Sequence, residues 1–366
     1  MRCPWLIFLL FASSFLGCAS NAIAQETCGL SNVQYNQMHK DGFESAQSTA
    51  VAKTMRRAVS AAVSDSGNLK IGKDINLGKA LGYAQKIAHG VAPTITIVTP
   101  LVNANLPGRK FEVRGTFTGP INTGVTVNGS PALTYGNQWA SLPMSPPAGS
   151  FTIEAIATTL DGMTANATRN ITVGNAQPQI ELLPKQAGSI APASIGFQFR
   201  SASGVILENI QVDFNGDGSV DFDGPAASIP TTFAYAAPGL YTARATTQIS
   251  GNSVSFERSI LIADVVVQRQ RACSVYGDLR DALTANDLEA SLLTFAVHKR
   301  EALRPFFNAL GSSRPTFATR LGTIANGIIG LEGARLTTIR LEAGQPIGYP
   351  LDISAGPDGV WRITSF

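Results

Sequence analysis

The sequence predicts a mainly β protein, with two tandem β-sandwiches preceded by a short helical region and followed by a small α+β domain. Only 14% of the 366 residues are charged while glycine and proline number 35 and 20, which favours short strands joined by turns. After Ala92 apolar and polar residues mostly alternate with period two, as in strands with one buried face. Changes of pattern predict a signal peptide at 1–24, a helical region at 25–91, sandwiches at 92–175 and 176–265, and the α+β domain at 274–366.

The N-terminus has the features of an export signal. Arg2 is followed by the apolar run Trp5–Leu16, and Ala22 and Ala24 form an A-x-A cleavage site before Gln25. The run is shorter than the roughly 20 residues that a membrane-spanning helix needs. We therefore expect cleavage between Ala24 and Gln25 and no transmembrane anchor, so that the protein is periplasmic, displayed on the cell surface or secreted.

An alternative reading of the leader is a lipid anchor. The residues Phe15-Leu16-Gly17-Cys18 resemble the lipobox of bacterial lipoproteins, although that motif usually begins with Leu. The resemblance implies lipidation of Cys18 in place of cleavage after Ala24.

Cysteine usage fits export. Cys3 and Cys18 belong to the leader, so the mature chain keeps Cys28 and Cys273. Because persistent thiols are uncommon in an oxidising compartment, we expect these two to form a disulfide between the N-terminal segment and the linker before the last domain. The alternative is a pair of unpaired, buried thiols.

The region before Ala92 has helical rather than strand periodicity. Within Ser45–Val63, apolar residues recur at steps of three and four, and Leu77–His89 predicts a second, weaker helix. Such helices can bind a partner or a membrane surface. We favour packing on each other or on the neighbouring sandwich, because the apolar residues are mostly Ala, which inserts poorly into lipid.

The first sandwich is predicted from alternating segments punctuated by Pro, Gly and Asn. The segments are Thr94–Thr99, Lys110–Phe117, Gly124–Val127, Phe151–Thr159 and Ala165–Val173. The run Gly124-Val125-Thr126-Val127-Asn128-Gly129, with Trp139 and the strand from Phe151, resembles bacterial immunoglobulin-like domains of secreted proteins.

The second sandwich carries a more specific resemblance. Val212-Asp213-Phe214-Asn215-Gly216-Asp217-Gly218, followed by Phe233-Ala234-Tyr235 and Pro238-Gly239-Leu240-Tyr241-Thr242, is similar to the PKD domain in order and spacing. The family commonly has a Trp just before its Asp-Phe pair, and this chain has Val212 at that position. The resemblance implies an extracellular sandwich that serves as a spacer or a binding module.

The last region combines helices and strands. A leucine pattern from Leu279 to Phe295 and the segment Lys299–Leu310 predict helices, and four strand-like runs follow Ile324. Its motifs from Ala285 to Leu292 and from Pro357 to Phe366 resemble nuclear-transport-factor-2-like proteins.

That resemblance implies a pocket enclosed by a curved sheet and three helices. The expected lining residues are Phe295, Phe306, Phe307, Ile339 and Trp361, with His298 and Glu301 as the nearby polar candidates. The alternative is an ordinary hydrophobic core.

One group of residues has the spacing of a metal loop. Asp213, Asn215, Asp217 and Asp221 place oxygen-bearing side chains at mostly alternate positions, as in the first half of a calcium loop, but the twelfth position is Gly224 instead of Glu. The alternative is a plain hairpin turn. Calcium is the only cofactor that the sequence raises.

Catalytic motifs are missing from the sequence. Its three histidines have no metal-ligand spacing, and a formal charge of +3 without a basic stripe argues against nucleic acid. We therefore expect a non-enzymatic envelope or secreted protein that binds an extracellular or envelope protein or a glycan, with its C-terminal module holding a partner or small ligand. An enzyme or enzyme accessory with its site in the C-terminal pocket is the alternative.

Overall fold

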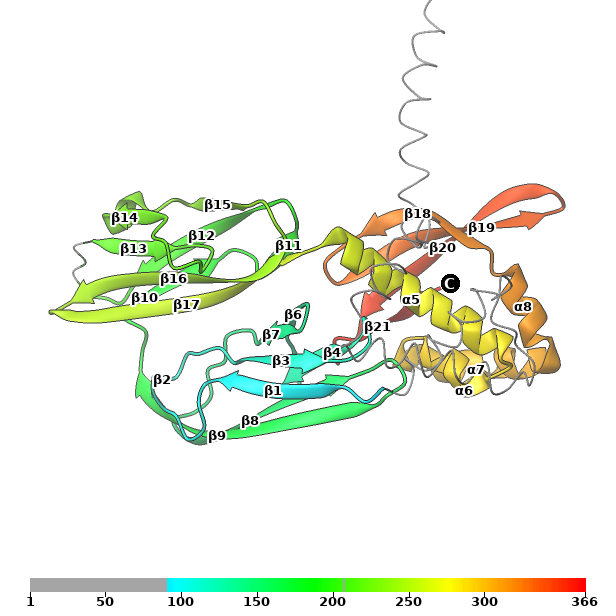
Figure 1. The fold of residues 1–366 in the computed structure, drawn as a ribbon, viewed down its shortest axis with the longest axis horizontal. Helices are drawn as coiled ribbons and strands as arrows, with labels where there is room; N and C mark the ends of the chain where they lie inside the picture. Colours follow the sequence, from blue (N-terminus) through cyan, green and yellow to red (C-terminus); the bar gives the residue numbers. More distant parts are fainter. Residues whose placement is uncertain (1–90, 206, 208) are drawn as a thin grey trace, which may run out of the picture.

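The computed structural model describes residues 91–205, 207 and 209–366. The predicted leader, Cys18, Cys28 and the helical region before Val91 lie outside these residues. The described chain is mainly β, as predicted, and forms three modules, each around its own hydrophobic core (Figure 1). None of its described helices is both long and apolar enough to cross a membrane.

The first module is a sandwich of two sheets, with strand orders β1-β3-β7-β6 and β2-β9-β8-β4-β5. Its core is filled from both sheets, and Trp139 is fully buried in it. The strands are β1 (Thr94–Thr99), β2 (Asn105–Gly108), β3 (Arg114–Thr118), β4 (Gly124–Val127), β5 (Ser130–Pro131), β6 (Leu133–Tyr135), β7 (Gln138–Ala140), β8 (Gly149–Thr158) and β9 (Thr164–Ala176).

The second module is also a two-sheet sandwich, with orders β10-β12-β15 and β11-β17-β16-β13-β14. Stacked aromatic rings fill its centre, among them Phe214 on Phe233 at 4.9 Å between centroids. The elements are β10 (Ile180–Pro184), β11 (Gly188–Ile190), β12 (Ala193–Ser201), β13 (Ile210–Asp213), β14 (Phe222–Gly224), the 3-10 turn η1 (Ala226–Ser228), β15 (Thr232–Tyr235), β16 (Gly239–Ile249) and β17 (Asn252–Ala263).

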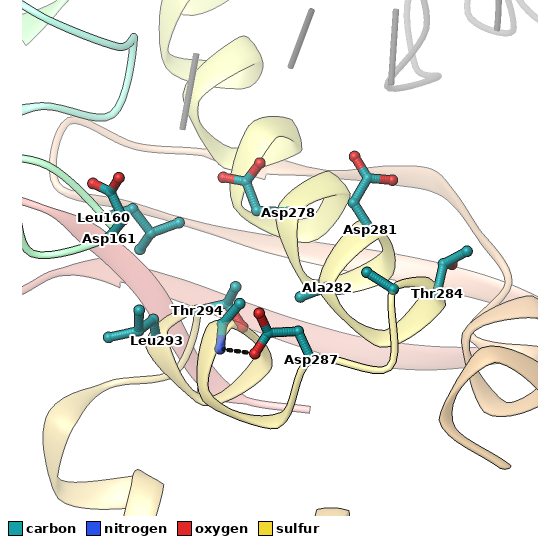
Figure 2. A pocket seen from close by; sticks show the side chains of 11 residues that line it. Leu160, Asp161, Asp278, Asp281, Ala282, Thr284, Asp287, Leu293 and Thr294 are labelled. Atoms are coloured by element: carbon teal, nitrogen blue, oxygen red, sulfur yellow. Dashed lines mark hydrogen bonds between the residues drawn. The ribbon is translucent and has the colours of Figure 1, made fainter. Parts of the chain in front are cut away.

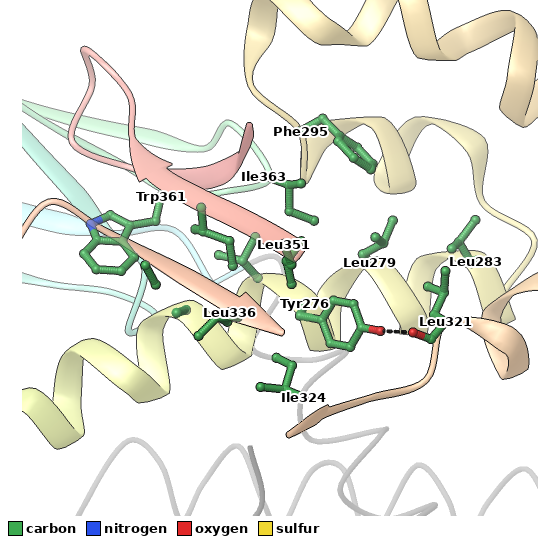
Figure 3. Packing of buried hydrophobic residues seen from close by; sticks show 14 of the residues in the cluster. Tyr276, Leu279, Leu283, Phe295, Leu321, Ile324, Leu336, Leu351, Trp361 and Ile363 are labelled. Atoms are coloured by element: carbon green, nitrogen blue, oxygen red, sulfur yellow. Dashed lines mark hydrogen bonds between the residues drawn. The ribbon is translucent and has the colours of Figure 1, made fainter. Parts of the chain in front are cut away.

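The third module packs helices on one four-stranded sheet, ordered β18-β19-β20-β21. Leu279 and Leu283 of the first helix belong to the same buried cluster as strand residues such as Leu351 (Figure 3), and the Tyr276 hydroxyl donates to the carbonyl of Leu321 at 2.6 Å. The elements are α5 (Val265–Thr284), α6 (Leu288–Leu293), α7 (Val297–Leu310), η2 (Gly311–Ser313), α8 (Arg314–Arg320), β18 (Thr323–Ile329), β19 (Gly333–Glu342), β20 (Gln345–Ala355) and β21 (Trp361–Ser365).

The linker predicted before the last module is wrong. Strand β17 ends at Ala263 and α5 begins at Val265, with Asp264 as the N-cap whose carboxylate accepts from the backbone N–H of Val266. Cys273 therefore lies within α5, partly buried against the core of the third module. The second and third modules are thus joined by one capping residue, which fixes the direction in which the helix leaves the sandwich.

Candidate functional site: the junction of the three modules

The modules touch one another through buried polar contacts. The side chain of Asn122, in the loop before β4, donates to the carbonyl of Trp361 and accepts from its backbone N–H, both at 2.9 Å. Both residues are buried. Because this amide satisfies both backbone groups of Trp361, it fastens the first sandwich to the last strand of the third module.

Close backbone packing supports the same contact. A Cβ on Gly124 would lie 2.2 Å from the carbonyl oxygen of Asp358, in the turn between β20 and β21. Gly359 in that turn has a φ of +76°, a conformation that favours glycine. Glycine on both sides lets the two backbones approach each other directly.

The two sandwiches meet through a charged interface. Glu112 accepts from the backbone N–H of Ser259 at 2.8 Å, and its other oxygen lies 3.7 Å from a guanidinium nitrogen of Arg258. Both side chains of this ion pair are at most 5% exposed. Nearby, Arg114 pairs with Glu257 at 2.8 Å, nearer the solvent.

Two adjoining pockets open where all three modules come together. The first has a volume of about 620 Å³ and is lined by the first sandwich, the segment around Gly188, α5 and the turn between β20 and β21. The second, of about 480 Å³, lies between α5 and the loops of the first sandwich around Pro120 and Gly136. Three residues line both: Thr134, Gln268 and Arg271. We call this combined hollow the junction cleft.

Helix α5 and its N-cap supply three of the polar side chains of the junction cleft, whose lining also includes Gln186 and Glu332. Asp264, Gln268 and Arg271 follow one another at steps of four and three along α5 and its N-cap, so they share one helix face. Asp264 uses its carboxylate to cap the helix. Gln268 and Arg271 are therefore the two residues on this face whose side chains can contact a molecule in the cleft.

Arg271 is a cation in a poorly solvated place. Its Nε donates to the carbonyl of Ile121 at 3.2 Å, and its guanidinium lies 5.6 Å from the centre of the Trp361 ring. Desolvation lowers the pKa of Arg271 to about 10. No carboxylate within the described residues forms an ion pair with it.

Gln268 presents an unsatisfied acceptor beside this cation. Its side chain is 5% exposed, and its Oε1 atom has no hydrogen-bond partner in the described part of the chain. A buried amide oxygen left without a donor costs about 1 to 3 kcal/mol. The positively charged guanidinium of Arg271 and the unsatisfied Oε1 atom of Gln268 thus belong to side chains three residues apart on α5.

The predicted metal residues form a tight turn. Asp213 accepts from the backbone N–H groups of Gly216 at 2.6 Å and Gly218 at 2.9 Å, and Asp221 accepts from that of Phe214 at 2.7 Å. The side-chain amide of Asn215 donates to the carboxylate of Asp217. The pKa of Asp217 is lowered, mainly by the hydrogen bond that its carboxylate accepts from the backbone N–H of Ser219. Residues 91–205, 207 and 209–366 hold no group of three or more acidic, His or Cys side chains placed for a metal ion. The geometry favours the turn, and calcium binding stays a prediction.

A calcium titration separates the two readings. Since the carboxylate oxygens of Asp213 already accept backbone N–H groups, we expect about 5 mM calcium to leave the melting temperature unchanged. Asp213→Ala should lower the unfolding free energy by about 1 to 2 kcal/mol, because two amides lose their acceptor. A melting temperature that rises with calcium in the native chain but not in this variant would establish the metal site.

The pocket expected inside the third module is not formed by the predicted lining residues. Phe295, Phe307 and Trp361 are at most 2% exposed in the packed core, whereas Phe306 and Ile339 are 47% and 38% exposed. His298 and Glu301 lie on the exposed side of α7. Trp361 lines the junction cleft instead, and the other four predicted lining residues do not line it.

The junction residues were missed because Gln268 and Arg271 fell in the predicted linker. A signal was present: Ala272, Val275 and Tyr276 extend the three- and four-residue spacing of Leu279 back toward Asp264, a favourable N-cap. That signal would have predicted the helix. It would not have predicted the cleft, which depends on residues from all three modules.

No protein family model matches the chain, and no curated protein matches it either. Among solved structures, the fibronectin(III)-like modules of Clostridium thermocellum CbhA align at 13% identity over 46% of this chain and 94% of theirs, with a TM-score of 0.19. The titin domains Z1Z2 in complex with telethonin align at 13% identity over 47% and 97%, with a TM-score of 0.18.

A third structure, dimeric latent PorU from Porphyromonas gingivalis, aligns at 9% identity over 49% of this chain and 21% of its own, with a TM-score of 0.28. At such identities and scores these alignments carry no argument about function.

Proposed function

We propose that this is an exported, non-catalytic binding protein whose junction cleft holds the carboxylate of a small ligand or of a chain end. The observation that carries the proposal is the pair formed by Arg271, a desolvated cation without an ion partner among the described residues, and Gln268, a buried acceptor without a donor there. A buried polar group without a partner needs an explanation, and in this proposal a ligand supplies the missing partners.

The ligand chemistry follows from the two groups. Arginine offers a planar fork that matches a carboxylate with two parallel hydrogen bonds. The free oxygen of Gln268 requires an O–H or N–H donor, placed close to that carboxylate because the two side chains are three residues apart on α5. Uronic acids, whose ring hydroxyls adjoin the carboxylate, and peptide C-termini, with an amide N–H, both have this pattern.

Export completes the proposal. The predicted leader, with its apolar run Trp5–Leu16 and its A-x-A cleavage site before Gln25, would direct the chain out of the cytoplasm, where the two sandwiches act as spacers or binding surfaces and the third module supplies the α5 face of the cleft. The extracellular or envelope partner is then a glycan or a protein. The enzyme alternative has no specific observation in its favour.

The predicted disulfide between Cys28 and Cys273 is part of the same proposal. Cys273 is partly buried on α5, where a bridge would hold the N-terminal segment to the helix that lines the cleft. We expect the exported chain to gain about 2 mass units on reduction and to react with iodoacetamide at both cysteines only afterwards. Labelling of both thiols without reduction contradicts the bridge.

A thermal-shift experiment on the full exported chain tests the binding proposal. We expect about 10 mM D-galacturonate, or a tripeptide with a free C-terminal carboxylate, to raise the melting temperature by about 3 °C or more if its Kd is below 1 mM. D-galactose and the same tripeptide with a C-terminal amide serve as matched neutral controls. The two acids distinguish a glycan from a peptide ligand. Equal shifts from each acid and its neutral control, or no shift from either acid, would contradict the proposal.

A further inference from the structure

The two pockets of the junction cleft follow one another along strand β6. Leu133 lines the first pocket, Tyr135 lines the second, and Thr134 between them lines both. Gln268 and Arg271 on α5 also line both pockets. These polar side chains therefore lie where the pockets join, and a ligand whose carboxylate binds Arg271 can extend from there in two directions.

Beyond the three shared residues, the first pocket is mainly apolar. Leu133 and Leu331 line it and are half-buried, and Leu142 lines it and is 43% exposed. The other polar residues in its described lining are Gln186 and Glu332, and both are exposed. We call this part of the junction cleft the apolar lobe.

All three modules contribute to the apolar lobe. Leu133 and Leu142 belong to the first module, while Leu331 lies in the turn between β18 and β19 of the third. Leu331 also reaches the second module, since a Cβ placed on Gly188 of β11 would lie 2.9 Å from its Cδ2 atom. The apolar lobe therefore depends on the docking of all three modules.

A sugar suits the apolar lobe poorly. Its ring carries hydroxyl groups in most directions, and each hydroxyl buried against leucine would lose its hydrogen bonds to water. The aromatic ring in the described lining of the first pocket belongs to Trp361, which is 1% exposed and offers no open face to a sugar ring. An apolar side chain, in contrast, gains free energy when the same leucine surface covers it. The lobe thus favours a peptide over a uronic acid.

The last residue of a peptide carries all the groups that the junction cleft can bind. Its carboxylate, side chain and backbone N–H are attached to one Cα atom. The carboxylate matches the guanidinium of Arg271, and the N–H can donate to the unsatisfied Oε1 atom of Gln268. The side chain then has the apolar lobe on one side, and the preceding residues have the second pocket beside Tyr135 on the other.

A separate hollow at the other end of α5 has the wrong charge for such a ligand. It has a volume of about 390 Å³ and shares no lining residue with the junction cleft. Figure 2 shows the carboxylates of Asp161, Asp278, Asp281 and Asp287 around it, and neither lysine nor arginine is among its described lining residues. A peptide carboxylate would meet like charges there, which disfavours binding.

We infer that the junction cleft binds the C-terminus of a protein or peptide whose last residue has a large apolar side chain. Arg271 holds the terminal carboxylate, Gln268 accepts from the last backbone N–H, and the apolar lobe selects the last side chain. The inference rests on the proposed function, because it takes Arg271 as the carboxylate site, and it assigns the ligand class that the proposed function leaves open between glycan and peptide.

Titration calorimetry of the full exported chain with two isomeric peptides tests the inference. N-acetyl-Gly-Ala-Phe ends in a large apolar residue, whereas N-acetyl-Phe-Ala-Gly has the same composition and charge but ends in glycine. We expect the first free acid to bind at least about tenfold more tightly than the second, because only its phenyl ring enters the apolar lobe. Its C-terminal amide should bind at least about tenfold more weakly than the acid, because the charge that pairs with Arg271 is gone.

The outcomes separate this inference from the proposed function. Equal affinity for the two free acids, each bound more tightly than its amide, would overturn the inference and leave the carboxylate site standing. Binding of D-galacturonate with neither peptide bound would overturn the inference in favour of a glycan. Failure of both peptides and of D-galacturonate to bind would overturn the inference and the proposed function together.

Leu142→Gln tests the wall of the apolar lobe. The measured quantity is the ratio of the affinities for the two isomeric acids, which a general weakening of the cleft leaves unchanged. We expect this ratio to fall at least about threefold, because part of the apolar surface is lost. Leu101→Gln is the matched control and should keep the native ratio, since Leu101 is 72% exposed and does not line the cleft. A native ratio in Leu142→Gln would overturn the assignment of the last side chain to the apolar lobe.

Discussion

Glu112→Ala is expected to lower the free energy of unfolding by about 3 to 5 kcal/mol, the usual cost of leaving one member of a buried ion pair alone. The substitution removes the acceptor of the Ser259 backbone N–H and the counter-charge of Arg258, whose side chain is 3% exposed. One guanidinium nitrogen of Arg258 already has no partner within the described chain. Urea denaturation of the full chain measures the change.

Glu257→Ala is the matched control, because it removes the same residue type from the same interface. Glu257 is 37% exposed and pairs with Arg114 and Arg244 nearer the solvent. We expect a loss below about 1 kcal/mol. If the free energy of unfolding falls by the same amount in both variants, burial of the Glu112 pair does not determine the strength of the interface.

The Glu112 carboxyl also gives the stability of the protein a pH dependence. Burial raises the pKa of Glu112 above its ordinary 4.5, so the folded state binds a proton that the unfolded state has already released. The free energy of unfolding should therefore decrease as pH rises through the range just above 4.5. Glu112→Gln removes this contribution, so the native and variant stability profiles should diverge in that range, whereas parallel profiles contradict the assignment.

Asn122→Ala is expected to lower the free energy of unfolding by about 2 to 4 kcal/mol, because it leaves both the N–H and the carbonyl of buried Trp361 without their side-chain partner. The loss should appear in the third module as well as in the first. Hydrogen exchange read out by mass spectrometry should show faster exchange in β21 and in the loop that contains Asn122.

Asn128→Gly provides a control with the same chemistry inside one module. Asn128 donates to the carbonyl of Thr152 at 3.0 Å and accepts from the backbone N–H of Glu154 at 3.2 Å, but it is exposed. Its φ of 46° makes glycine the substitution that adds no backbone strain. We expect a loss below about 1 kcal/mol and no change in exchange at β21. Faster exchange at β21 in this variant would show that the effect of Asn122 is not specific to the junction.

Much of the fold was predictable from local pattern. Strand β1 occupies Thr94–Thr99 as expected, because a period-two alternation of Ile and Thr has one stable burial pattern. The Gly124–Val127 strand was predicted with its observed bounds, although all four of its residues are buried. The segment from Lys110 was predicted too long, since β3 begins only at Arg114. Of the residues before it, Phe111 forms only an isolated bridge with Met144, while the Glu112 side chain accepts from Ser259 of the second sandwich.

The candidate site was not predictable in the same way. Asn122 and Trp361 are 239 positions apart, and nothing in the sequence around either indicates the other. Arg271 is one of 28 basic residues, and only packing shows that it is desolvated without a carboxylate beside it in the described chain. Local periodicity predicts which face of an element is buried, whereas a cleft between modules depends on how separate cores dock.

The most direct test of the account compares Arg271→Met with the native full chain by titration calorimetry with D-galacturonate and with the free-acid tripeptide. Methionine keeps most of the side-chain volume and removes the desolvated charge, so the unliganded variant should unfold with a free energy equal to that of the native chain or up to about 1 kcal/mol higher. The account predicts that the acid bound by the native chain binds the variant at least about tenfold more weakly. Native affinity in a folded Arg271→Met chain would contradict the assignment of the junction cleft as the binding site.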